Sequence, residues 1–562
     1  MYLKGLKQNI ILAKYNPENR ILVLILVFVL LGLLIWGRFF YLTVIRHDYY
    51  LAKAKNISDN SGAIPRGSIF LTDKDNVPYA VALNKEFPLV YAVPVKVKDP
   101  ANLAKKLVPI LELDEQLLFQ KLSKPNDPYE ILKKKVSDNT INAIKALEEP
   151  ALGIDDETLR YYPEGLYLSQ VIGFLGFNKD GQAGQYGLEE YYDKDLSGLI
   201  SSADLVLTID SAIQAQAGTL LAAAVKKWQA NSGSIVVMNP KSGDILAMAS
   251  SPDFDANNYF VVLDKNIFVN PVTLKRYEPG SVFKPITMAI GIETNAVTPE
   301  TEYYNTGSIK INDKTISNSL PNEVLGWQTM TTVLEQSLNT GAIFVEQKVP
   351  KDIFLKYLKD FGINSKTGID VNEVSGDLSG LSSMRDVNFA TASFGQGVAL
   401  TPIELLRALS AIANGGKLVR LHLVAKIVSR NGETYGTKND PQPQIISSET
   451  SIKLINMLVK AVENGSGRRA QVKGYTVAGK TGTAQVPDLK NGGYLDEYIH
   501  TFVGFAPAYD PKFIALIKLD NPRGVRFAES TVVSVFHDLA QFIFSYLAIP
   551  PDKPGSENST AQ

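Results

Sequence analysis

The chain has 562 residues, of which 45% are hydrophobic and 20% are charged, and its formal net charge at pH 7 is −1. This length is enough for two or three domains, and the composition is that of a globular protein. A balanced charge gives no overall attraction to nucleic acid, so we expect no nucleic-acid partner. The absence of cysteine excludes disulfides and thiolate zinc sites, and with four widely separated histidines we expect neither a catalytic metal nor another cofactor.

An apolar stretch near the N-terminus predicts one membrane-spanning signal anchor over residues 21–45. Its length exceeds the ~20 residues that a helix needs to cross a ~30 Å hydrocarbon core. Residues 1–20 hold four basic side chains and one acidic side chain. The positive-inside rule therefore predicts a cytoplasmic tail and places everything after the anchor outside the membrane. Arg38 is expected to extend toward a headgroup region.

A cleaved signal peptide is the alternative interpretation of this segment, because Ala52-Lys-Ala54 offers a small-x-small cleavage site. The apolar core exceeds the usual 7–15 residues, and the bulky run Phe39-Phe-Tyr41 separates it from that site. A retained anchor is the favoured interpretation.

Residues 46–200 are predicted to form a domain without catalytic machinery. Short strand-like runs such as Leu89–Val95 are mixed with charged stretches that we interpret as helices, such as Glu130–Lys135. Lys105-Lys106 and Lys133–Lys135 are interpreted as solvated helix faces. We find no catalytic constellation in this region.

A second domain is predicted over residues 201–548, followed by a Pro- and Ser-rich tail at 549–562 that we expect to be disordered. The domain opens with Ala203–Asp210, and a long amphipathic helix is expected over Gln214–Trp228. Further strands and a closing helix are expected at Ser234–Met238, Asp244–Ala249, Thr476–Ala478, Tyr498–Phe505, Phe513–Leu519 and Thr531–Leu547. Strands at both ends with helices between them predict an α+β fold with one antiparallel sheet.

The segment Glu278–Thr287 contains a serine and a lysine three residues apart, Ser281 and Lys284. On a helix, residues at i and i+3 share a face with Cβ atoms about 5–6 Å apart, so an uncharged lysine amine can take the proton of the serine hydroxyl. Pro279-Gly280 is a turn signal that would start a helix here. The pattern predicts serine acyl-transfer chemistry without histidine, although S-x-x-K alone is a weak signal.

Two later motifs strengthen this prediction. Ser337-Leu-Asn339 lies in a stretch whose apolar spacing suits a helix end or a loop on the core, and Lys480-Thr-Gly-Thr483 is flanked by small residues that let a substrate lie against a strand. A second Lys-Thr-Gly, at Lys366–Gly368, is interpreted as a helix-to-loop exit. The other S-x-N matches are interpreted as solvated turns, at residues 58–60, 137–139, 429–431 and 556–558.

These three motifs, in this order, resemble those of the penicillin-binding proteins, and the resemblance covers most of the chain. Further blocks are similar to the same family and to its class B, monofunctional branch. They are Pro65-Arg-Gly67, Tyr162-Pro163, Gly187-Leu-Glu189, Leu207–Asp210 with Gln214, Asn239–Met248, Ser393–Gly397 with Thr401-Pro402, and Phe502–Pro507. One departure is Ile69–Thr72, where similar chains run on from the first block to a short acidic-basic turn.

The resemblance implies an elongated, non-catalytic pedestal of dimerisation type over residues 46–200 and a transpeptidase domain over residues 201–548. The transpeptidase domain would have a five-stranded antiparallel sheet flanked by helices and a mainly helical subdomain. Its implied activity is peptidoglycan D,D-transpeptidation, in which an acyl-enzyme cross-links stem peptides that end in D-Ala-D-Ala. β-Lactams would inhibit it because their strained amide mimics the D-Ala-D-Ala bond.

The resemblance also implies a role for each catalytic residue. Ser281 would attack the peptide carbonyl, Lys284 would take its proton, and Lys480 would be the nearby cation that keeps the Lys284 amine uncharged. Ser337 would relay a proton to the leaving amine. Asn339 would bind the acyl side chain and help to orient Lys284.

Substrate binding is assigned in the same way to the last motif. Thr481 and Thr483 would hold the terminal carboxylate with Gly482 between them, and the substrate would lie antiparallel along Thr476–Gln485. Backbone N–H groups of Ser281 and Thr483 would form the oxyanion hole.

Partners and location follow from the resemblance together with the anchor. The implied location is the bacterial cytoplasmic membrane, crossed once, with the N-terminus inside and the catalytic domain outside. Since a monofunctional enzyme receives its glycan from another protein, the implied partner is a polytopic glycosyltransferase of the shape, elongation, division and sporulation family. Whether the chain serves septal or lateral wall growth stays open.

Three other functions remain alternatives. A D,D-carboxypeptidase or β-lactamase would use the same motifs but transfer the acyl group to water. A β-lactam sensor would need an intracellular module, and only about 20 residues precede the anchor. A non-catalytic scaffold of the division or elongation machinery would not need the intact motif residues.

Overall fold

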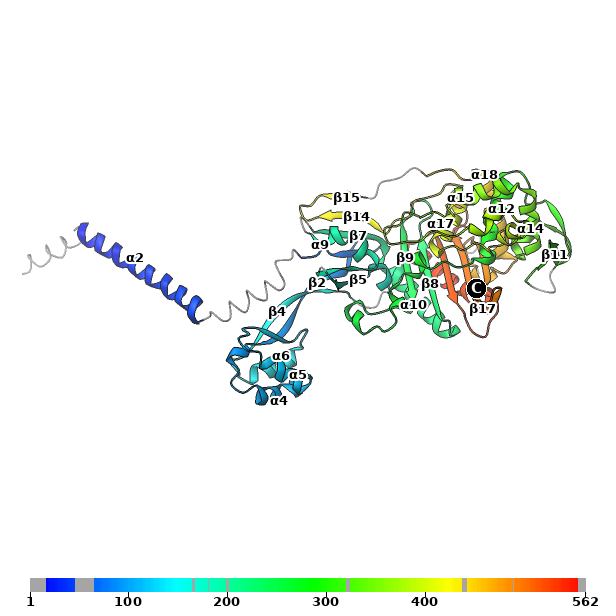
Figure 1. The fold of residues 1–562 in the computed structure, drawn as a ribbon. Coiled ribbons are helices and arrows are strands. Elements are labelled where there is room, and N and C mark those ends of the chain that lie inside the picture. The colour runs from blue at the N-terminus through cyan, green and yellow to red at the C-terminus, as the bar shows by residue number, and fades with distance from the viewer. Residues whose placement is uncertain are drawn as a thin grey trace, which may run out of the picture. The chain divides into compact units, whose positions relative to one another are not determined.

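The computed structural model describes residues 17–45, 65–163, 167–179, 181–198, 202–319, 324–436, 442–488 and 490–553. The chain divides into two compact units, one of Met1–Ala63 with Lys85–Leu159 and one of Ile64–Asn84 with Arg160–Gln562. Figure 1 shows the fold of both. The expected cleavage site at 52–54 and the S-x-N matches at 58–60 and 556–558 lie outside the described residues.

The N-terminal anchor is a helix, α2 (Pro17–Phe40), that continues into a π-helical turn at Tyr41–Ile45. Leu, Ile, Val and Phe dominate it, and the stretch Ile21–Ile45 is long and apolar enough to span a membrane. Inside the span, the Thr43 hydroxyl donates to the carbonyl of Phe39, 2.8 Å away, and so needs no water. The expected apolar anchor helix is confirmed.

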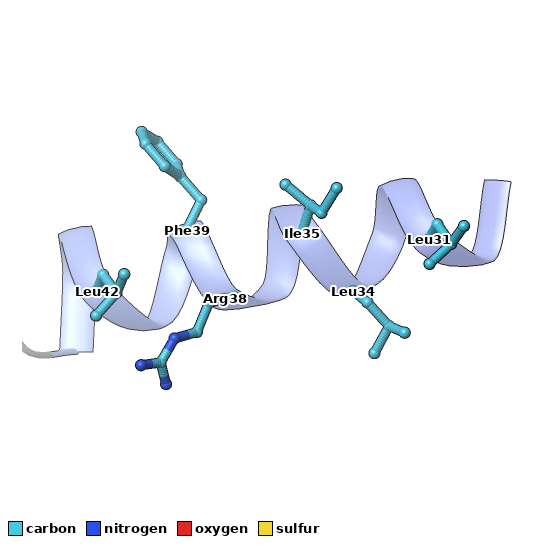
Figure 2. A pocket seen from close by; sticks show the side chains of 6 residues that line it. All are labelled: Leu31, Leu34, Ile35, Arg38, Phe39 and Leu42. Atoms are coloured by element: carbon cyan, nitrogen blue, oxygen red, sulfur yellow. The ribbon is translucent and has the colours of Figure 1, made fainter. Parts of the chain in front are cut away.

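Figure 2 shows a shallow groove on α2, lined by five apolar side chains and one cation: Leu31, Leu34, Ile35, Arg38, Phe39 and Leu42. Their spacing of three and four residues places them along one side of a helix. The groove belongs to the membrane-spanning segment, and its lining offers no nucleophile and no general base.

The first unit contains three helices, α4 (Pro100–Leu111), α5 (Glu115–Leu122) and α6 (Asp138–Ala146). Each begins at a capping side chain, Asp99, Asp114 or Ser137, that accepts a backbone N–H of the first turn. They share a core with strand residues. Its buried members are Val90, Ala92, Leu103, Ala104, Leu107, Leu111, Leu118, Leu122, Leu132, Val136 and Ile144. Lys105 and Lys106 are exposed on α4, as expected.

The interpretation of Glu130–Lys135 as a helix is wrong. Residues Glu130–Lys133 form strand β3, which pairs with the end of strand β2 (Pro78–Ala92). Leu132 is buried in the core, while Lys133 donates to the carbonyl of Leu111 at 2.6 Å and so caps the end of α4. A four-residue strand has too few residues to show alternation, and its lysines resemble a solvated helix face.

Two strands belong to both units. Strand β2 pairs with β1 (Ile69–Thr72) in the second unit and with β3 in the first, and β4 (Leu152–Tyr161) also pairs with β2. The departure noted at Ile69–Thr72 is thus strand β1, which runs parallel to β7 (Ala203–Asp210). Antiparallel to β7 lies β14 (Val424–Ser429), followed by the edge strand β15 (Thr434–Gly436).

The second unit is built on a five-stranded antiparallel sheet of order β16-β17-β18-β8-β9. Its strands are β16 (Ala478–Pro487), β17 (Tyr494–Ala506), β18 (Phe513–Asp520), β8 (Ser232–Met238) and β9 (Ile245–Ser251). All five were expected, and β16 lies at one end of the order, where it pairs with β17. The expected α+β fold with this sheet is confirmed.

Alternate residues of these strands face two different cores. Ile235 and Val237 face one core, which α10 (Ser211–Trp228) and α19 (Val532–Tyr546) complete. Val236 and Met238 face a larger core on the other side, where the helical subdomain lies. Helices α12 (Lys284–Glu293), α14 (Asn339–Lys348), α15 (Lys351–Asp360), α17 (Pro402–Ala413) and α18 (Ser448–Glu463) gather on that side (Figure 1).

The other helices of the second unit are short or belong to the helical subdomain. They are α7 (Ser169–Ile172), α8 (Gly187–Tyr191), α9 (Asp193–Ser197), α11 (Pro271–Leu274), α12 (Lys284–Glu293), α13 (Met330–Glu335), α14 (Asn339–Lys348), α15 (Lys351–Asp360), α16 (Asp386–Ala392), α17 (Pro402–Ala413) and α18 (Ser448–Glu463). The 3-10 turns are η2 (Pro94–Lys96) in the first unit and η3 (Ala256–Val261), η4 (Lys265–Phe268), η5 (Gly280–Phe283), η6 (Ser379–Ser383), η7 (Arg468–Ala470) and η8 (Ala528–Ser530) in the second. Three small antiparallel pairs are β5 (Phe174–Asn178) with β6 (Gly181–Gln185), β10 (Glu302–Asn305) with β13 (Gly326–Thr329), and β11 (Ser308–Ile311) with β12 (Lys314–Ser317).

The expectation of a disordered tail at 549–562 is wrong for residues 549–553. Ile549 is buried, its carbonyl accepts the Tyr475 hydroxyl at 2.7 Å, and the Asp552 carboxylate accepts the backbone N–H of Thr476 at 2.7 Å. Residues 549–553 therefore pack against the segment that leads into β16. Residues 554–562 lie outside the described part of the chain.

Candidate active site

Ser281 lies on the 3-10 turn η5, directly before helix α12, which begins at Lys284. Gly280 has a φ of +62°, a conformation that glycine adopts without strain, and it turns the chain into the helix. The backbone N–H of Lys284 donates to the carbonyl of Ser281, so the two residues lie at the two ends of one 3-10 turn. Lys284 is 1% exposed, whereas Ser281 is half-buried. The predicted helix start is confirmed.

Ser337 lies next to the lysine. The Lys284 amine donates to the backbone carbonyl of Ser337 in a short contact, and its nitrogen is 3.2 Å from the Ser337 Oγ. Ser337 has a φ of +58° in the turn between α13 and α14, and the next residue, Leu338, is fully buried. The prediction of a loop packed on the core is therefore confirmed, and two motifs far apart in sequence meet at Lys284.

Asn339 is the first residue of α14 and is buried. Its side-chain amide donates to the carbonyl of Ser317 on β12, 2.9 Å away. Strand β12 therefore fixes the orientation of the Asn339 amide. Its expected roles, contact with the acyl side chain and orientation of Lys284, stay predictions.

The third motif lies on the edge strand β16. Lys480 is 2% exposed, and its amine donates to the carbonyl of Thr481 at 3.2 Å. A Cβ on Gly482 would lie 2.9 Å from the carbonyl oxygen of Pro279, so a glycine here lets β16 pack against the turn that carries Ser281. The Thr483 hydroxyl accepts the backbone N–H of Ala528 at 3.1 Å.

A buried histidine holds the turn that contacts Thr483. His500, opposite Thr483 in the β16–β17 register, is fully buried, and its Nε2 donates to the carbonyl of Arg526 at 3.1 Å. Its Nδ1 is 2.9 Å from the hydroxyl of Thr531. Burial lowers the pKa of His500 to about 4, so the ring is neutral near pH 7. The described residues contain no cluster of His, Asp or Glu able to hold a metal.

Burial of Lys480 makes its charge costly. Desolvation lowers the pKa of this amine from 10.5 to about 7, so both protonation states are populated at neutral pH. The sequence interpretation takes Lys480 as the nearby cation, whereas its burial makes that charge depend on pH.

This burial predicts a pH-dependent stability. Between pH 7 and 10.5 the unfolded chain binds this proton and the folded chain releases it, so stability rises with pH in that window. From pH 7 to pH 9 the gain is about 2 kcal/mol. We expect the melting temperature of full-length protein in detergent to rise more over this range than that of Lys480→Met. Parallel curves for the two proteins would contradict the assignment.

The Ser281 turn is held by a loop that the sequence did not assign to the site. The N–H of Gly280 donates to the carbonyl of Gly395 at 3.0 Å. The N–H of Gly397 and the hydroxyl of Tyr494 both donate to the Glu278 carboxylate at 3.0 Å, and burial raises the pKa of that carboxyl. In the sequence, the Ser393–Gly397 block was identified only by its resemblance to the family. Its glycines were the feature that could have indicated a close backbone contact with the Ser281 turn.

Gly395→Ala is expected to slow acylation of Ser281 about tenfold or more. Gly395 has a φ of +80°, and a Cβ there would lie 2.3 Å from the carbonyl oxygen of Gly280, so the serine turn must shift. Gly432→Ala is the matched control, because Gly432 has a φ of +86° and nothing lies within 4 Å of its Cβ position. Labelling by a fluorescent penicillin measures the effect. Equal rates for the two variants would show that the contact with Gly280 does not matter.

The second Lys-Thr-Gly, at Lys366–Gly368, has a different role. Thr367 is buried, and both its N–H and its hydroxyl donate to the carboxylate of Glu373. Gly368 donates its N–H to the same carboxylate. This motif is a loop after α15 that satisfies its own polar groups, in agreement with the sequence interpretation.

Comparison with known proteins agrees with this geometry. Residues 233–541 match the family described as penicillin binding protein transpeptidase domain, and residues 63–208 match the penicillin-binding protein dimerisation domain. The chain is a class B penicillin-binding protein. It is 33% identical to stage V sporulation protein D of Bacillus subtilis (strain 168) over 577 residues, which cover 96% of this chain and 88% of that protein.

A second relative and a solved structure are also similar to this chain. The chain is 30% identical to a probable peptidoglycan D,D-transpeptidase PbpC of Pseudomonas aeruginosa, over 96% of this chain and 97% of that protein. Penicillin binding protein 3 from Mycobacterium tuberculosis, in complex with aztreonam, has a similar structure, with a TM-score of 0.69 and 25% identity. The match covers 88% of this chain and 98% of that one.

Proposed function

We propose that this class B penicillin-binding protein is a serine-type D,D-transpeptidase that cross-links peptidoglycan stem peptides through a Ser281 acyl-enzyme. The observation that carries the proposal is the contact of the buried Lys284 amine with Ser337. Lys284 lies one turn after Ser281, and the turn that carries Ser281 packs against the edge strand β16. The transpeptidase family match and the relatives named as D,D-transpeptidases support the same reaction.

In the first half-reaction, Ser281 Oγ attacks the carbonyl carbon of the D-Ala-D-Ala bond, and its proton passes to the neutral amine of Lys284. The oxyanion of the tetrahedral intermediate accepts hydrogen bonds from the backbone N–H groups of Ser281 and Thr483. The C–N bond then breaks, and the Ser337 hydroxyl delivers a proton to the leaving amine of D-Ala while Lys284 returns one to Ser337. An ester on Ser281 remains.

In the second half-reaction, the amine of a neighbouring stem peptide attacks this ester. The amine loses a proton through Ser337 and Lys284, a new amide bond forms, and Ser281 recovers its hydroxyl proton. No water is consumed, so one amide bond is formed for each amide bond that is broken.

Substrate recognition is proposed for the motif on β16. The hydroxyls of Thr481 and Thr483 would donate to the terminal carboxylate, and Asn339 would contact the acyl side chain. Because β16 ends the sheet, an extended peptide can add to its free edge by backbone hydrogen bonds, and Gly482 keeps that edge close to Ser281.

Placement in the cell is proposed from the anchor. The chain crosses the cytoplasmic membrane of a bacterium once at residues 21–45, with residues 1–20 inside, a pedestal over 46–200 and the transpeptidase domain over 201–548 outside. The glycan would come from a polytopic glycosyltransferase of the shape, elongation, division and sporulation family.

Intact-mass spectrometry of the full-length protein in detergent, after incubation with benzylpenicillin and followed by peptide mapping, tests the proposal. We expect a stable adduct of one drug mass on the Ser281 peptide, and a cross-linked product when a D-Ala-D-Ala peptide and an acceptor amine are supplied. Rapid return to the free mass, with a hydrolysed product, would indicate a carboxypeptidase or β-lactamase. No adduct would indicate a non-catalytic scaffold.

A further inference from the structure

A serine outside the three motifs contacts the third one directly. Ser466 lies in the turn between α18 and η7, and its Oγ is 2.6 Å from the hydroxyl oxygen of Thr481. The turn reads Gly465-Ser466-Gly467, and it comes shortly before β16 in the sequence. None of the roles assigned above uses this hydroxyl.

The position of Ser466 is fixed by its neighbours. A Cβ on Gly465 would lie 2.2 Å from the carbonyl oxygen of Glu335, so the turn packs against the end of α13 at a distance that only glycine allows. Asn464 reinforces this contact, because its side-chain amide donates to the Glu335 carboxylate at 3.3 Å. Since Glu335 is two residues before Ser337, the Ser466 turn joins the second motif to the third.

The two hydroxyls are close enough that one must donate to the other. A hydroxyl has one proton and two lone pairs, and oxygens 2.6 Å apart share a single hydrogen bond. If Ser466 donates, Thr481 keeps its own proton for another acceptor. If Thr481 donates, its proton is used inside the protein and cannot reach a substrate.

The other threonine proposed to bind the carboxylate, Thr483, favours the first arrangement by comparison. Thr483 Oγ1 accepts the backbone N–H of Ala528 at 3.1 Å, and a backbone N–H can only donate. The proton of Thr483 is therefore left for a substrate. The Lys480 amine is 3.5 Å from the hydroxyl oxygen of Thr481 and 3.2 Å from its carbonyl oxygen. A second donor therefore lies close to the Thr481 hydroxyl.

We propose that Ser466 is a positioning residue of the carboxylate site: its hydroxyl donates to Thr481 Oγ1 and thereby directs the Thr481 proton toward the substrate carboxylate. This role rests on the proposed function, in which Thr481 and Thr483 hold that carboxylate. Each threonine hydroxyl then accepts one hydrogen bond, Thr481 from Ser466 and Thr483 from the backbone N–H of Ala528. Both hydroxyls can therefore donate their own proton to the substrate carboxylate.

Acylation by a charged and an uncharged probe tests this role in the full-length protein. Benzylpenicillin carries the carboxylate, and its methyl ester does not. Ser466→Ala is expected to lower the second-order acylation rate with benzylpenicillin on the order of tenfold, because the Thr481 hydroxyl is then no longer oriented toward the carboxylate, and to leave the rate with the ester within about twofold. Ser466→Thr keeps the hydroxyl and should restore the selectivity for the charged probe.

Two comparisons separate this role from a general structural one. In a Thr481→Val background, Ser466→Ala should have no further effect on the ratio of the two rates. Ser382→Ala is a matched control, because the Ser382 hydroxyl donates to a backbone carbonyl on an exposed turn, and it should change neither rate. Equal losses with both probes, or no loss with benzylpenicillin, would overturn the inference. Failure of the wild-type protein to acylate at all would instead overturn the proposed function.

Discussion

Ser281→Ala is expected to abolish covalent labelling by benzylpenicillin and all cross-linking of D-Ala-D-Ala peptides. The variant lacks the only atom that forms the ester in the proposed mechanism, so no acyl-enzyme can accumulate. Removal of a nucleophile from a covalent mechanism costs on the order of 10⁶-fold in rate, which is below detection in a labelling assay. Intact-mass spectrometry of wild-type and variant protein after the same incubation measures the loss.

Two controls show that the loss is chemical. The melting temperature of Ser281→Ala should stay close to that of the wild type, because Ser281 is half-buried and the substitution keeps its Cβ. Thr367→Val should label normally, although it alters the other Lys-Thr-Gly motif, because the hydrogen bonds of Thr367 go to Glu373 and Ile369 within its own loop. An adduct on Ser281→Ala, mapped to any other serine, would contradict the assignment of the nucleophile.

The sequence predicted those parts of the fold that depend on local patterns. The i, i+3 spacing of Ser281 and Lys284 with Pro279-Gly280 before them placed the start of α12 correctly, and strand-like runs of mostly apolar residues located strands such as β17 and β18. Their assembly into one sheet followed from the family resemblance and the order of the strands. The error at Glu130–Lys135 occurred where the strand was too short for its period to show.

The parts that sequence could not supply are contacts between segments far apart in the chain. Ser466 and Thr481 are separated by a turn and a strand start, and only the fold shows that their hydroxyls are 2.6 Å apart. Gly395 supports the Ser281 turn from more than 100 residues away. Burial of Lys480, and with it the lowered pKa, also depends on packing that no local pattern encodes.

Lys284→Met is expected to lower the acylation rate with benzylpenicillin by about 10²–10⁴-fold, the usual contribution of a general base. Methionine has a similar length and no amine, so it fills the same buried position but cannot accept the Ser281 proton. Because Lys284 is 1% exposed, removal of its amine ends the desolvation cost of that group but also takes a hydrogen bond from the Ser337 carbonyl, and we expect only a small change in melting temperature. Stopped-flow labelling with a fluorescent penicillin measures the rate.

The contact between Lys284 and Ser337 makes a second, sharper prediction for the same variant. If the two residues act as one proton relay, Ser337→Ala should slow acylation in the wild-type background but add little to Lys284→Met, because the relay is already broken. Independent effects that multiply in the double variant would mean that Ser337 works without Lys284. Unchanged labelling of Lys284→Met would mean that Ser281 loses its proton to another base, and Lys480, buried and partly neutral at pH 7, would be the next residue to test.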